Sequence, residues 1–220
     1  MEELQRLQEV ALNEKTRLAQ RNTFIASLNI RSISSNFENL KSDKQVRARV
    51  IALQETWCAK GQDIEQYQMN GYNMHFVSHG RGKGVATYFL PEFRLTGEIN
   101  ALKYQMCKVS CKNFDVINIY RSKDADNAHF LKDLGQLAKG PKPCFLVGDF
   151  NINVLKESLH PVVKKISSCG FQQLVGYPTH SAGGLLDHVY VENIPFQPDI
   201  GINFPFYSDH ANVTVVKPLL

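Results

Sequence analysis

The sequence of 220 residues lacks any long apolar run, and none of its segments approaches the ~18 residues that a membrane-spanning helix needs. It has no excess of glycine or proline, at 14 and 9 residues, and its 43% hydrophobic and 21% charged residues are close to ordinary globular usage, which excludes collagen and a mostly disordered chain. The first ten residues have no apolar core of a secretory signal, so we expect no secretion. A formal net charge of only +4 tolerates a polyanionic partner without requiring one.

Cysteine is also scarce, and its five copies show no short paired spacing. The odd count and the spacing argue against a disulfide framework and against a zinc site. Cys107 and Cys111 lie in a segment that alternates like a strand, so both are expected on one side of it. We therefore expect buried free thiols and a reducing compartment, the nucleus or the cytoplasm.

Two regions of different composition make up the chain. Residues 1–22 contain no glycine or proline and are rich in good helix formers, which predicts a helical arm or linker; a partner-binding helix is the alternative. One helical face of this region is apolar: Leu4, Leu7, Ala11 and Leu18. Residues 23–220 are expected to form a single domain, because strand-like and helix-like segments alternate throughout.

The order of these segments predicts an α/β fold. Strands are expected at 24–28, 50–53, 72–77, 85–90, 104–111, 114–119, 143–147, 187–191, 199–203 and 213–216. Helices are expected at 37–49, at 124–139 with Asp124 as the N-cap, and at 157–169 with Gly170 as the stop. Because hairpins alternate with helical crossovers, packed sheets flanked by helices are favoured over a doubly wound sheet.

Polar residues follow many of the apolar strands at the point where each ends. They are Asn29, Glu55, Tyr120, Asp149, Asn151, Asp187, Asp209 and His210. Each has an ordinary explanation on its own: an Asx-rich turn at 148–151, a surface glutamate, or a structural histidine. Their recurrence at strand ends, where open sheets tend to place their sites, indicates a single functional site.

Six segments carry a resemblance to a known family. They are SLNIRS (27–32), LQETW (53–57), INIYRS (117–122), VGDFNIN (147–153), LLDHVY (185–190) and YSDHANV (207–213). In this order they resemble the endonuclease/exonuclease/phosphatase superfamily of Mg²⁺-dependent phosphoesterases, over residues 23–216. SLNIRSI together with PTHSAGGLLDHVYV is most similar to the endonuclease domains of non-LTR retrotransposons and related mobile elements. The implied fold is a four-layered α/β sandwich, with two mixed β-sheets packed face to face and helices outside.

The resemblance implies a role for each residue near the metal. Glu55 would be the principal ligand of Mg²⁺, for which Mn²⁺ would substitute, and Asp209 would lie beside the ion. Asn29 would hold water at the metal or a phosphate oxygen. Asp149 would activate the attacking water, and Asn151 would orient that water and the phosphate. A carboxylate close to a hard cation suits this chemistry, because the cation neutralises the phosphodiester and the carboxylate accepts the proton.

Further residues would contact the substrate. The resemblance implies that Tyr120 donates its hydroxyl to a phosphate oxygen and that His210 contacts the scissile phosphate. Asp187 would accept a hydrogen bond from the other ring nitrogen of His210 and thereby favour the charged imidazolium. Ser208 and Thr179 would be supporting groups.

Two departures from the family pattern concern substrate binding. Arg31 stands where some relatives carry an acidic group near the metal, which puts a second direct metal ligand in doubt. It is either a phosphate contact or a surface arginine. Only seven residues separate Thr179 from Asp187, and they include no long side chain for reading base edges.

The segment HGRGKGV (79–85) is a third candidate for substrate contact. It carries Arg81 and Lys83 in a glycine-spaced loop, where each charge could meet a DNA phosphate; a plain hairpin turn is the alternative. The spacing does not match a phosphate-cradling nucleotide loop.

The sequence thus predicts a Mg²⁺-dependent DNA endonuclease that nicks one strand of double-stranded DNA and leaves a 3′-hydroxyl and a 5′-phosphate. We expect it to be part of a larger mobile-element polypeptide, with no membrane partner. A related phosphoesterase acting on abasic DNA, RNA or phosphoinositides is the alternative. A catalytically inactive DNA-binding module is disfavoured, because Glu55, Asp149, Asn151, Asp187 and His210 are all present.

Overall fold

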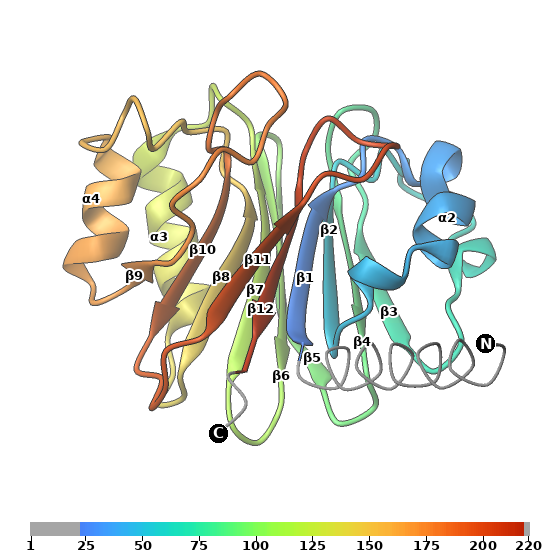
Figure 1. Cartoon of the computed structure of the whole chain (residues 1–220), viewed down its shortest axis with the longest axis horizontal. Helices are drawn as coiled ribbons and strands as arrows, with labels where there is room; N and C mark the ends of the chain where they lie inside the picture. Colours follow the sequence, from blue (N-terminus) through green and yellow to red (C-terminus); the bar gives the residue numbers. More distant parts are fainter. Residues whose placement is uncertain (1–22, 218–220) are drawn as a thin grey trace, which may run out of the picture.

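The protein is described by a computed structural model of residues 23–217, so the expected arm at 1–22 lies outside the described residues. Two six-stranded sheets pack face to face (Figure 1). The first sheet has the order β11-β12-β1-β2-β4-β3 and comprises β1 (Thr23–Asn29), β2 (Val50–Gln54), β3 (Asn73–Val77), β4 (Val85–Phe89), β11 (Asp199–Asn203) and β12 (Asn212–Val216). The second has the order β5-β6-β7-β8-β10-β9 and comprises β5 (Arg94–Ala101), β6 (Tyr104–Ser110), β7 (Asp115–Arg121), β8 (Cys144–Asp149), β9 (Gln172–Gln173) and β10 (Asp187–Glu192).

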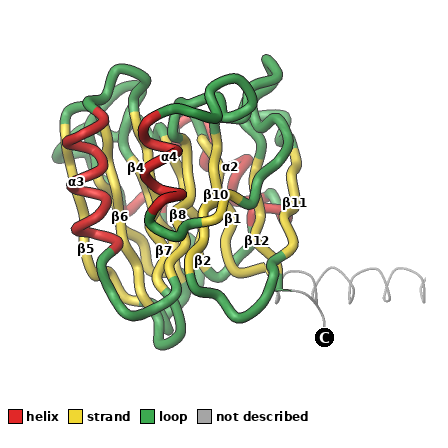
Figure 2. Tube along the Cα trace, turned by 90° about the vertical axis from the view of Figure 1, so that its left-hand side faces the viewer, coloured by secondary structure: helices red, strands yellow, loops and turns green. Residues whose placement is uncertain are grey.

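Helices cover the outer face of each sheet, which confirms the expected four-layered sandwich. Helix α2 (Ile33–Ser42) and the short 3₁₀ turns η1 (Lys44–Val46) and η2 (Glu65–Tyr67) lie outside the first sheet. Helices α3 (Asn127–Ala138) and α4 (Pro161–Ser168) lie outside the second (Figures 1 and 2). In the part of the chain that the structure describes, no helix has the length and apolar character needed to span a bilayer.

Three apolar clusters fill the spaces between the four layers. The central one joins the two sheets, and the outer ones join each sheet to its helices. Successive residues of β1 show the division: Ile25 belongs to the central cluster and Ala26 to the cluster under α2. Strands buried on both faces read as continuous apolar runs, which is why the sequence signalled them clearly.

The first helix lies earlier than the expected range 37–49. Ile33, Phe37 and Leu40 are the residues that α2 buries, at the spacing of one helical face. The helix ends before Asp43, whose carboxylate accepts the backbone N–H of Gln45 at 2.8 Å and starts a separate 3₁₀ turn. The expected range was wrong because an Asx cap interrupts the helix-like stretch.

The N-termini of the other two helices also differ from expectation. Asp126, not Asp124, caps α3 by accepting the backbone N–H of His129 at 2.8 Å. Helix α4 begins at Pro161 instead of residue 157, because proline suits the first turn of a helix. Strands β5 and β9 were missed, since β5 is an exposed edge strand with polar positions and β9 has only two residues.

Buried amides tie the two sheets together below the polar strand ends. Asn118 of β7 donates to the backbone carbonyls of Leu53 and Ala86, at 3.2 and 2.9 Å. Gln54 at the end of β2 donates to Asn118 Oδ1 at 2.8 Å. Because both amides are fully buried, these bonds fix how the ends of β2 and β7 face each other.

His188 of β10 makes stability depend on pH. Its ring is fully buried, stacks on Phe150 with centroids 4.7 Å apart, and contacts the carbonyl of Ile152 through Nε2 at 2.9 Å. Burial lowers the pKa of His188 from 6.5 to about 4. Between pH 6.5 and about pH 4 the His188 imidazole is protonated in the unfolded chain but neutral in the folded protein. Protonation therefore stabilises the unfolded state, and the free energy of unfolding decreases as the pH falls below 6.5.

We expect the free energy of unfolding of the wild type, relative to His188→Gln, to fall by roughly 2–3 kcal/mol between pH 7 and pH 4.5. Glutamine does not titrate, and its amide can still donate to the Ile152 carbonyl. Urea unfolding of both proteins at each pH measures the difference. An equal pH dependence in the two proteins would show that His188 does not cause it.

Candidate active site

Polar residues from both sheets meet at one edge of the sandwich. Asn29 is the last residue of β1, and Glu55 directly follows β2, which pairs parallel to β1. In the second sheet, Tyr120 of β7 pairs with Asp149 at the end of parallel strand β8, and Asp187 pairs with Asp149 from antiparallel strand β10. The topology thus brings together five of the residues expected at the site.

Loops at the same edge supply the others. Asn151 follows β8, Thr179 precedes β10, and Ser208, Asp209 and His210 lie just before β12. An isolated antiparallel bridge pairs His180 with His210, and beside it the backbone N–H of Ala211 donates to the carbonyl of Thr179 at 2.7 Å. All eight residues marked by the strand-end pattern are therefore gathered at one end of the fold.

Backbone strain is concentrated in these loops. Six non-glycine residues have positive φ among residues 23–217, and five of them are at this edge: Arg31, Ser32, Glu55, Trp57 and Asn151. Such conformations cost energy and persist where the surroundings fix them, which is typical of functional sites.

Asn29 joins the two carboxylates that the sequence placed near the metal. Its Nδ2 donates to Glu55 Oε1 at 3.1 Å and to Asp149 Oδ2 at 2.9 Å, and its side chain is fully buried. Its Oδ1 accepts the backbone N–H of Arg31 at 3.2 Å. In this orientation the amide fixes the spacing of Glu55 and Asp149, while its contact with a metal or phosphate stays a prediction.

Asp149 is a buried carboxylate held by several donors. Asn151 donates its backbone N–H to Oδ1 at 2.8 Å and its Nδ2 to Oδ2 at 3.1 Å. Burial, followed by the negative charge of Asp187, raises the pKa of Asp149 to about 7. A carboxyl with such a pKa is suited to accept a proton near neutral pH.

Gly148 allows Asp149 to reach this position. Its φ is +135°, and a Cβ atom built there would lie 2.0 Å from the carbonyl oxygen of Ile119 on the neighbouring strand. Only glycine fits this close approach of β8 to β7.

Asp187 and His210 form a buried pair beside Asp149. Nδ1 of His210 lies 2.9 and 3.1 Å from the two carboxylate oxygens of Asp187. Thr179 Oγ1 accepts the backbone N–H of Asp187 at 3.0 Å and fixes the start of β10. Burial opposes the charged imidazolium, but the hydrogen bond and charge of Asp187, with the charges of Asp149 and Asp209, outweigh it and raise the pKa of His210 to about 9.

Ser208 and Tyr120 complete the site from opposite sheets. Ser208 Oγ donates to the carbonyl of Asn29 at 2.7 Å and accepts the backbone N–H of His210 at 3.1 Å, so it fixes the β11–β12 loop to β1. Burial and the negative charge of Glu55 raise the pKa of Tyr120 to about 12. The phenol therefore stays protonated and remains a hydrogen-bond donor.

The donor set at the site fits a hard divalent cation. Each oxygen of Glu55 accepts one hydrogen bond, from Asn29 and from Trp57 Nε1 at 3.1 Å, and each keeps a free lone pair. Asp209 Oδ1 is buried without a hydrogen-bond partner. Carboxylate oxygens of this kind suit Mg²⁺ or Mn²⁺.

His180 is the main site residue that the sequence pattern did not single out. Its ring stands perpendicular to that of His210 at 4.8 Å, and its Nε2 lies 3.5 Å from Asp209 Oδ2. His180, Asp209 and His210 have potential ligand atoms within 4.8 Å of one another. However, Nδ1 of His180 accepts the backbone N–H of Ala182 at 3.0 Å, which leaves the proton on Nε2. His180 is therefore a donor toward Asp209 and not a ligand for a metal.

The three cations expected to bind phosphate already have partners in the protein. Arg31 forms an ion pair with Asp209, and its side chain is 49% exposed. The guanidinium of Arg81 lies 5.7 Å from the ring centroid of Trp57. Lys83 Nζ donates to the carbonyl of Leu102 at 2.8 Å. Their contact with DNA stays a prediction.

The short segment before Asp187 folds back tightly. The backbone N–H groups of Thr179 and His180 both donate to the carbonyl of Gly184, at 2.8 and 2.9 Å. Gly183 adopts φ +81° at the tip of this turn. The segment therefore holds Thr179 and His180 in place and extends no hairpin from the site.

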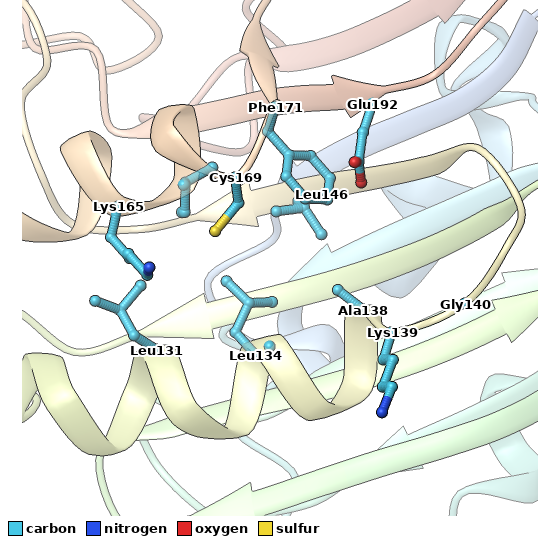
Figure 3. Close-up of a pocket in the computed structure, with 12 residues that line it drawn as sticks. Leu131, Leu134, Ala138, Lys139, Gly140, Leu146, Lys165, Cys169, Phe171 and Glu192 are labelled. Atoms are coloured by element: carbon cyan, nitrogen blue, oxygen red, sulfur yellow. The ribbon is translucent and has the colours of Figure 1, made fainter.

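A cavity of about 330 Å³ lies elsewhere, between α3 and α4 (Figure 3). Leu131, Leu134 and Phe171 line it, with Lys139 and Glu192 at its rim (Figure 3). Glu192 pairs with the first residue of β8, at the strand end opposite Asp149. The cavity is therefore separate from the candidate active site.

Comparison with protein families and solved structures agrees with the observed fold. The sequence profile of the Endonuclease/Exonuclease/phosphatase family matches residues 26–210. No curated protein sequence matches the chain significantly.

Three solved structures show the similarity of fold. An AP endonuclease from Archaeoglobus fulgidus is 20% identical with a TM-score of 0.68, covering 89% of this chain and 99% of its own. The 3′ phosphatase NExo from Neisseria, bound to a product DNA hairpin, is 16% identical with a TM-score of 0.67 and the same coverage. The endonuclease domain of TRAS1, a telomere-specific non-LTR retrotransposon, is 14% identical with a TM-score of 0.65, covering 89% and 98%. The retrotransposon domain is thus no closer than the others.

Proposed function

Because this chain belongs to the endonuclease/exonuclease/phosphatase family of metal-dependent phosphoesterases, we propose that it is a Mg²⁺-dependent DNA endonuclease that nicks one strand of a duplex. We further propose that this chain is the target-nicking domain of a mobile-element polypeptide. The motifs SLNIRSI and PTHSAGGLLDHVYV support this proposal. Duplex DNA is the proposed partner.

One observation carries the proposal. Asp149 is a buried carboxylate with a raised pKa. Asn29 links it to Glu55 on one side, and the Asp187–His210 pair lies on its other side. A general base, a cation ligand and a positive donor are the groups that hydrolysis of a phosphodiester needs at one place.

Each group has a defined task in the proposed reaction. A bound Mg²⁺ would be held by Glu55 and Asp209 and would offset the negative charge of the phosphate. Asp149 accepts a proton from water, whose oxygen attacks phosphorus while the bond to the 3′-oxygen breaks. The 3′-oxygen leaves as an alkoxide and takes a proton from solvent to become the 3′-hydroxyl, and the 5′-phosphate stays on the other fragment. His210 and Tyr120 donate hydrogen bonds to the phosphate oxygens as charge develops.

Supercoiled plasmid tests this function directly. We expect open-circle DNA to form with Mg²⁺ and not with EDTA. The nicks should be sealed by DNA ligase, which requires a 3′-hydroxyl beside a 5′-phosphate. Intact plasmid after incubation with Mg²⁺ and with Mn²⁺ would overturn the proposal.

Abasic DNA is the second candidate substrate, since an AP endonuclease is among the structures that share the fold. The two functions are separated by a pair of labelled duplexes that differ only by one abasic site. Comparable cleavage of both supports the general nickase. Cleavage confined to the abasic duplex supports the alternative.

Arg81→Ala should weaken DNA binding to a similar degree for all sequences, because an interaction with phosphate carries no base information. If Arg81 neutralises one phosphate, the slope of log K against log salt should become shallower by about one. The effect of Lys83→Ala should be smaller, since its ammonium is already held by the Leu102 carbonyl. Fluorescence anisotropy at several salt concentrations measures both. Lys139→Ala is the control, because Lys139 is exposed beside the remote cavity. If Arg81→Ala and this control have the same salt slope, Arg81 does not contact a DNA phosphate.

A further inference from the structure

Two exposed phenylalanines lie in the β11–β12 loop, directly before the site residues Ser208, Asp209 and His210. Phe206 is 89% exposed and Phe204 is 48% exposed. Both border a shallow groove between this loop and the end of α2. Exposure this high is unusual for a phenylalanine, whose burial is worth several times the energy of a methylene.

The turn that carries Phe206 is flanked on both sides by residues that contact the rest of the fold. The backbone N–H of Ser208 donates to the carbonyl of Pro205 at 3.3 Å, and Pro205 is buried. Tyr207 packs against the apolar cluster under α2, and its hydroxyl donates to Asp43 at 2.9 Å. Phe206 is therefore held out into solvent by a braced turn.

This turn also lies next to the proposed chemistry. Ser208 Oγ donates a hydrogen bond to the carbonyl of Asn29 and accepts one from the backbone N–H of His210. Two residues of chain span at most about 7 Å, so the Cα of Phe206 lies within that distance of Ser208. His210 is two residues further along, so the Cα atoms of Phe206 and His210 lie within about 14 Å, a distance of about four nucleotides along one strand.

We infer that Phe206 inserts as an apolar wedge at a base step within a few base pairs of the cut phosphate of duplex DNA, with the exposed Phe204 ring on the same loop. Apolar side chains that enter a duplex in this way unstack one step and kink the helix. The cost of unstacking is lowest at flexible TA and CA/TG steps, so the wedge selects sites by deformability. This inference rests on the proposed function.

The surroundings favour DNA over a protein as the occupant. The rest of the groove is mostly polar. Asn39, Ser42 and Gln45 line one side together with the oppositely charged Asp43 and Lys44, and Asn203 lies on the other side. A protein interface would instead bury an apolar centre larger than two rings. Arg31 at the adjoining loop is paired with Asp209, but its side chain is 49% exposed and brings a guanidinium to this end of the molecule, which suits contact with a phosphate backbone.

The wedge also supplies the selectivity that base reading does not. The turn between Thr179 and Asp187 carries no long side chain for base edges and is folded back on Gly184. Selection among sites then depends on the shape and stiffness of the DNA.

The test uses full-length Asp149→Asn protein, which should bind without cutting, and a 30-base-pair duplex with 2-aminopurine at a central TA step. Binding should raise the 2-aminopurine fluorescence, because the base becomes unstacked. Adding Phe206→Ala should abolish the rise and lower the preference for the TA duplex over an A-tract duplex by about tenfold. Adding Phe206→Leu should retain part of both, since leucine is also an apolar wedge.

Leu95→Ala is the matched control. Leu95 is another exposed apolar residue, but it lies on β5 and pairs with Val109 of β6, at the end of the sheet opposite Gln105, the residue that pairs with Tyr120 of the site. It should leave the signal and the preference unchanged.

Several results would overturn the inference. A 2-aminopurine rise and step preference that survive Phe206→Ala would show that the ring does not enter DNA. A sedimentation coefficient that falls in Phe206→Ala would assign the ring to an interface between two copies of the chain. Both leave the proposed nicking in place. If the plasmid assay shows nicking and only the wedge signal is absent, the inference alone fails; if the parent protein does not bind duplex DNA, the proposed function fails with it.

Discussion

Asp149→Asn should lower the rate of DNA nicking by about 10²- to 10⁴-fold, the range for loss of a positioned general base. The carboxylate is buried, its pKa is raised to about 7, and three donors hold it in one orientation. An asparagine cannot accept the proton of water, and its amide nitrogen would face the donors of Asn29 and Asn151. Single-turnover nicking of a labelled duplex measures the effect. Binding should persist, because one carboxylate that repels phosphate has been removed.

The control for this variant is Asp115→Asn. Asp115 is also a buried carboxylate, paired with Lys108 at 2.8 Å, but it lies at the opposite end of the same strand pair. It should lose stability in urea and keep its nicking rate. Near wild-type nicking by correctly folded Asp149→Asn, judged by circular dichroism, would remove Asp149 from the role of base.

Strand ends were the part of the site that the sequence could predict. Asn29, Glu55, Asp149 and Asp187 each adjoin an apolar strand, and parallel or antiparallel pairing brings such ends to one edge. The pattern therefore located the site before any contact was known. It did not reveal that Asn29 links Glu55 to Asp149, because that link joins positions 26 and 120 residues apart.

Residues that act through loop geometry were not predictable in the same way. His180 approaches Asp209 only because the turn at Gly183 and Gly184 folds its segment back onto the loop before β12. In the sequence, its only signal is its position directly after Thr179. Trp57 was likewise a neighbour of Glu55 in the motif, and its hydrogen bond to that carboxylate depends on a positive φ that side-chain patterns do not encode.

The accuracy of the predicted secondary structure depended in the same way on how clearly the sequence showed each element. Strands buried on both faces, such as β7 and β8, were expected within about two residues of their bounds. Helix α2 was displaced because Asp43 ends it through a local cap, and β5 was missed because an exposed edge strand buries too little to show an apolar pattern.

Glu55→Gln should weaken Mg²⁺ binding by about 100-fold and reduce nicking in parallel at limiting metal, since a hard cation requires the anionic oxygen. The chain contains a single tryptophan, and Trp57 Nε1 donates to Glu55 Oε2 at 3.1 Å. Tryptophan fluorescence therefore reports directly on this carboxylate. A Mg²⁺ titration of the wild type should give a saturable change, and the midpoint should move to much higher concentration in the variant.

Two comparisons separate a missing ligand from a disturbed loop. Glu98→Gln removes a carboxylate that pairs with His75, where β5 and β3 form the edges of the two sheets. This variant should titrate with Mg²⁺ like the wild type. Trp57→Phe should keep most of the metal dependence of nicking, because it removes one hydrogen bond to Glu55 and leaves the charge in place. If Glu55→Gln titrates with the wild-type midpoint, the ion is held elsewhere at the site, and Asp209, with its unpartnered buried oxygen, becomes the carboxylate to replace next.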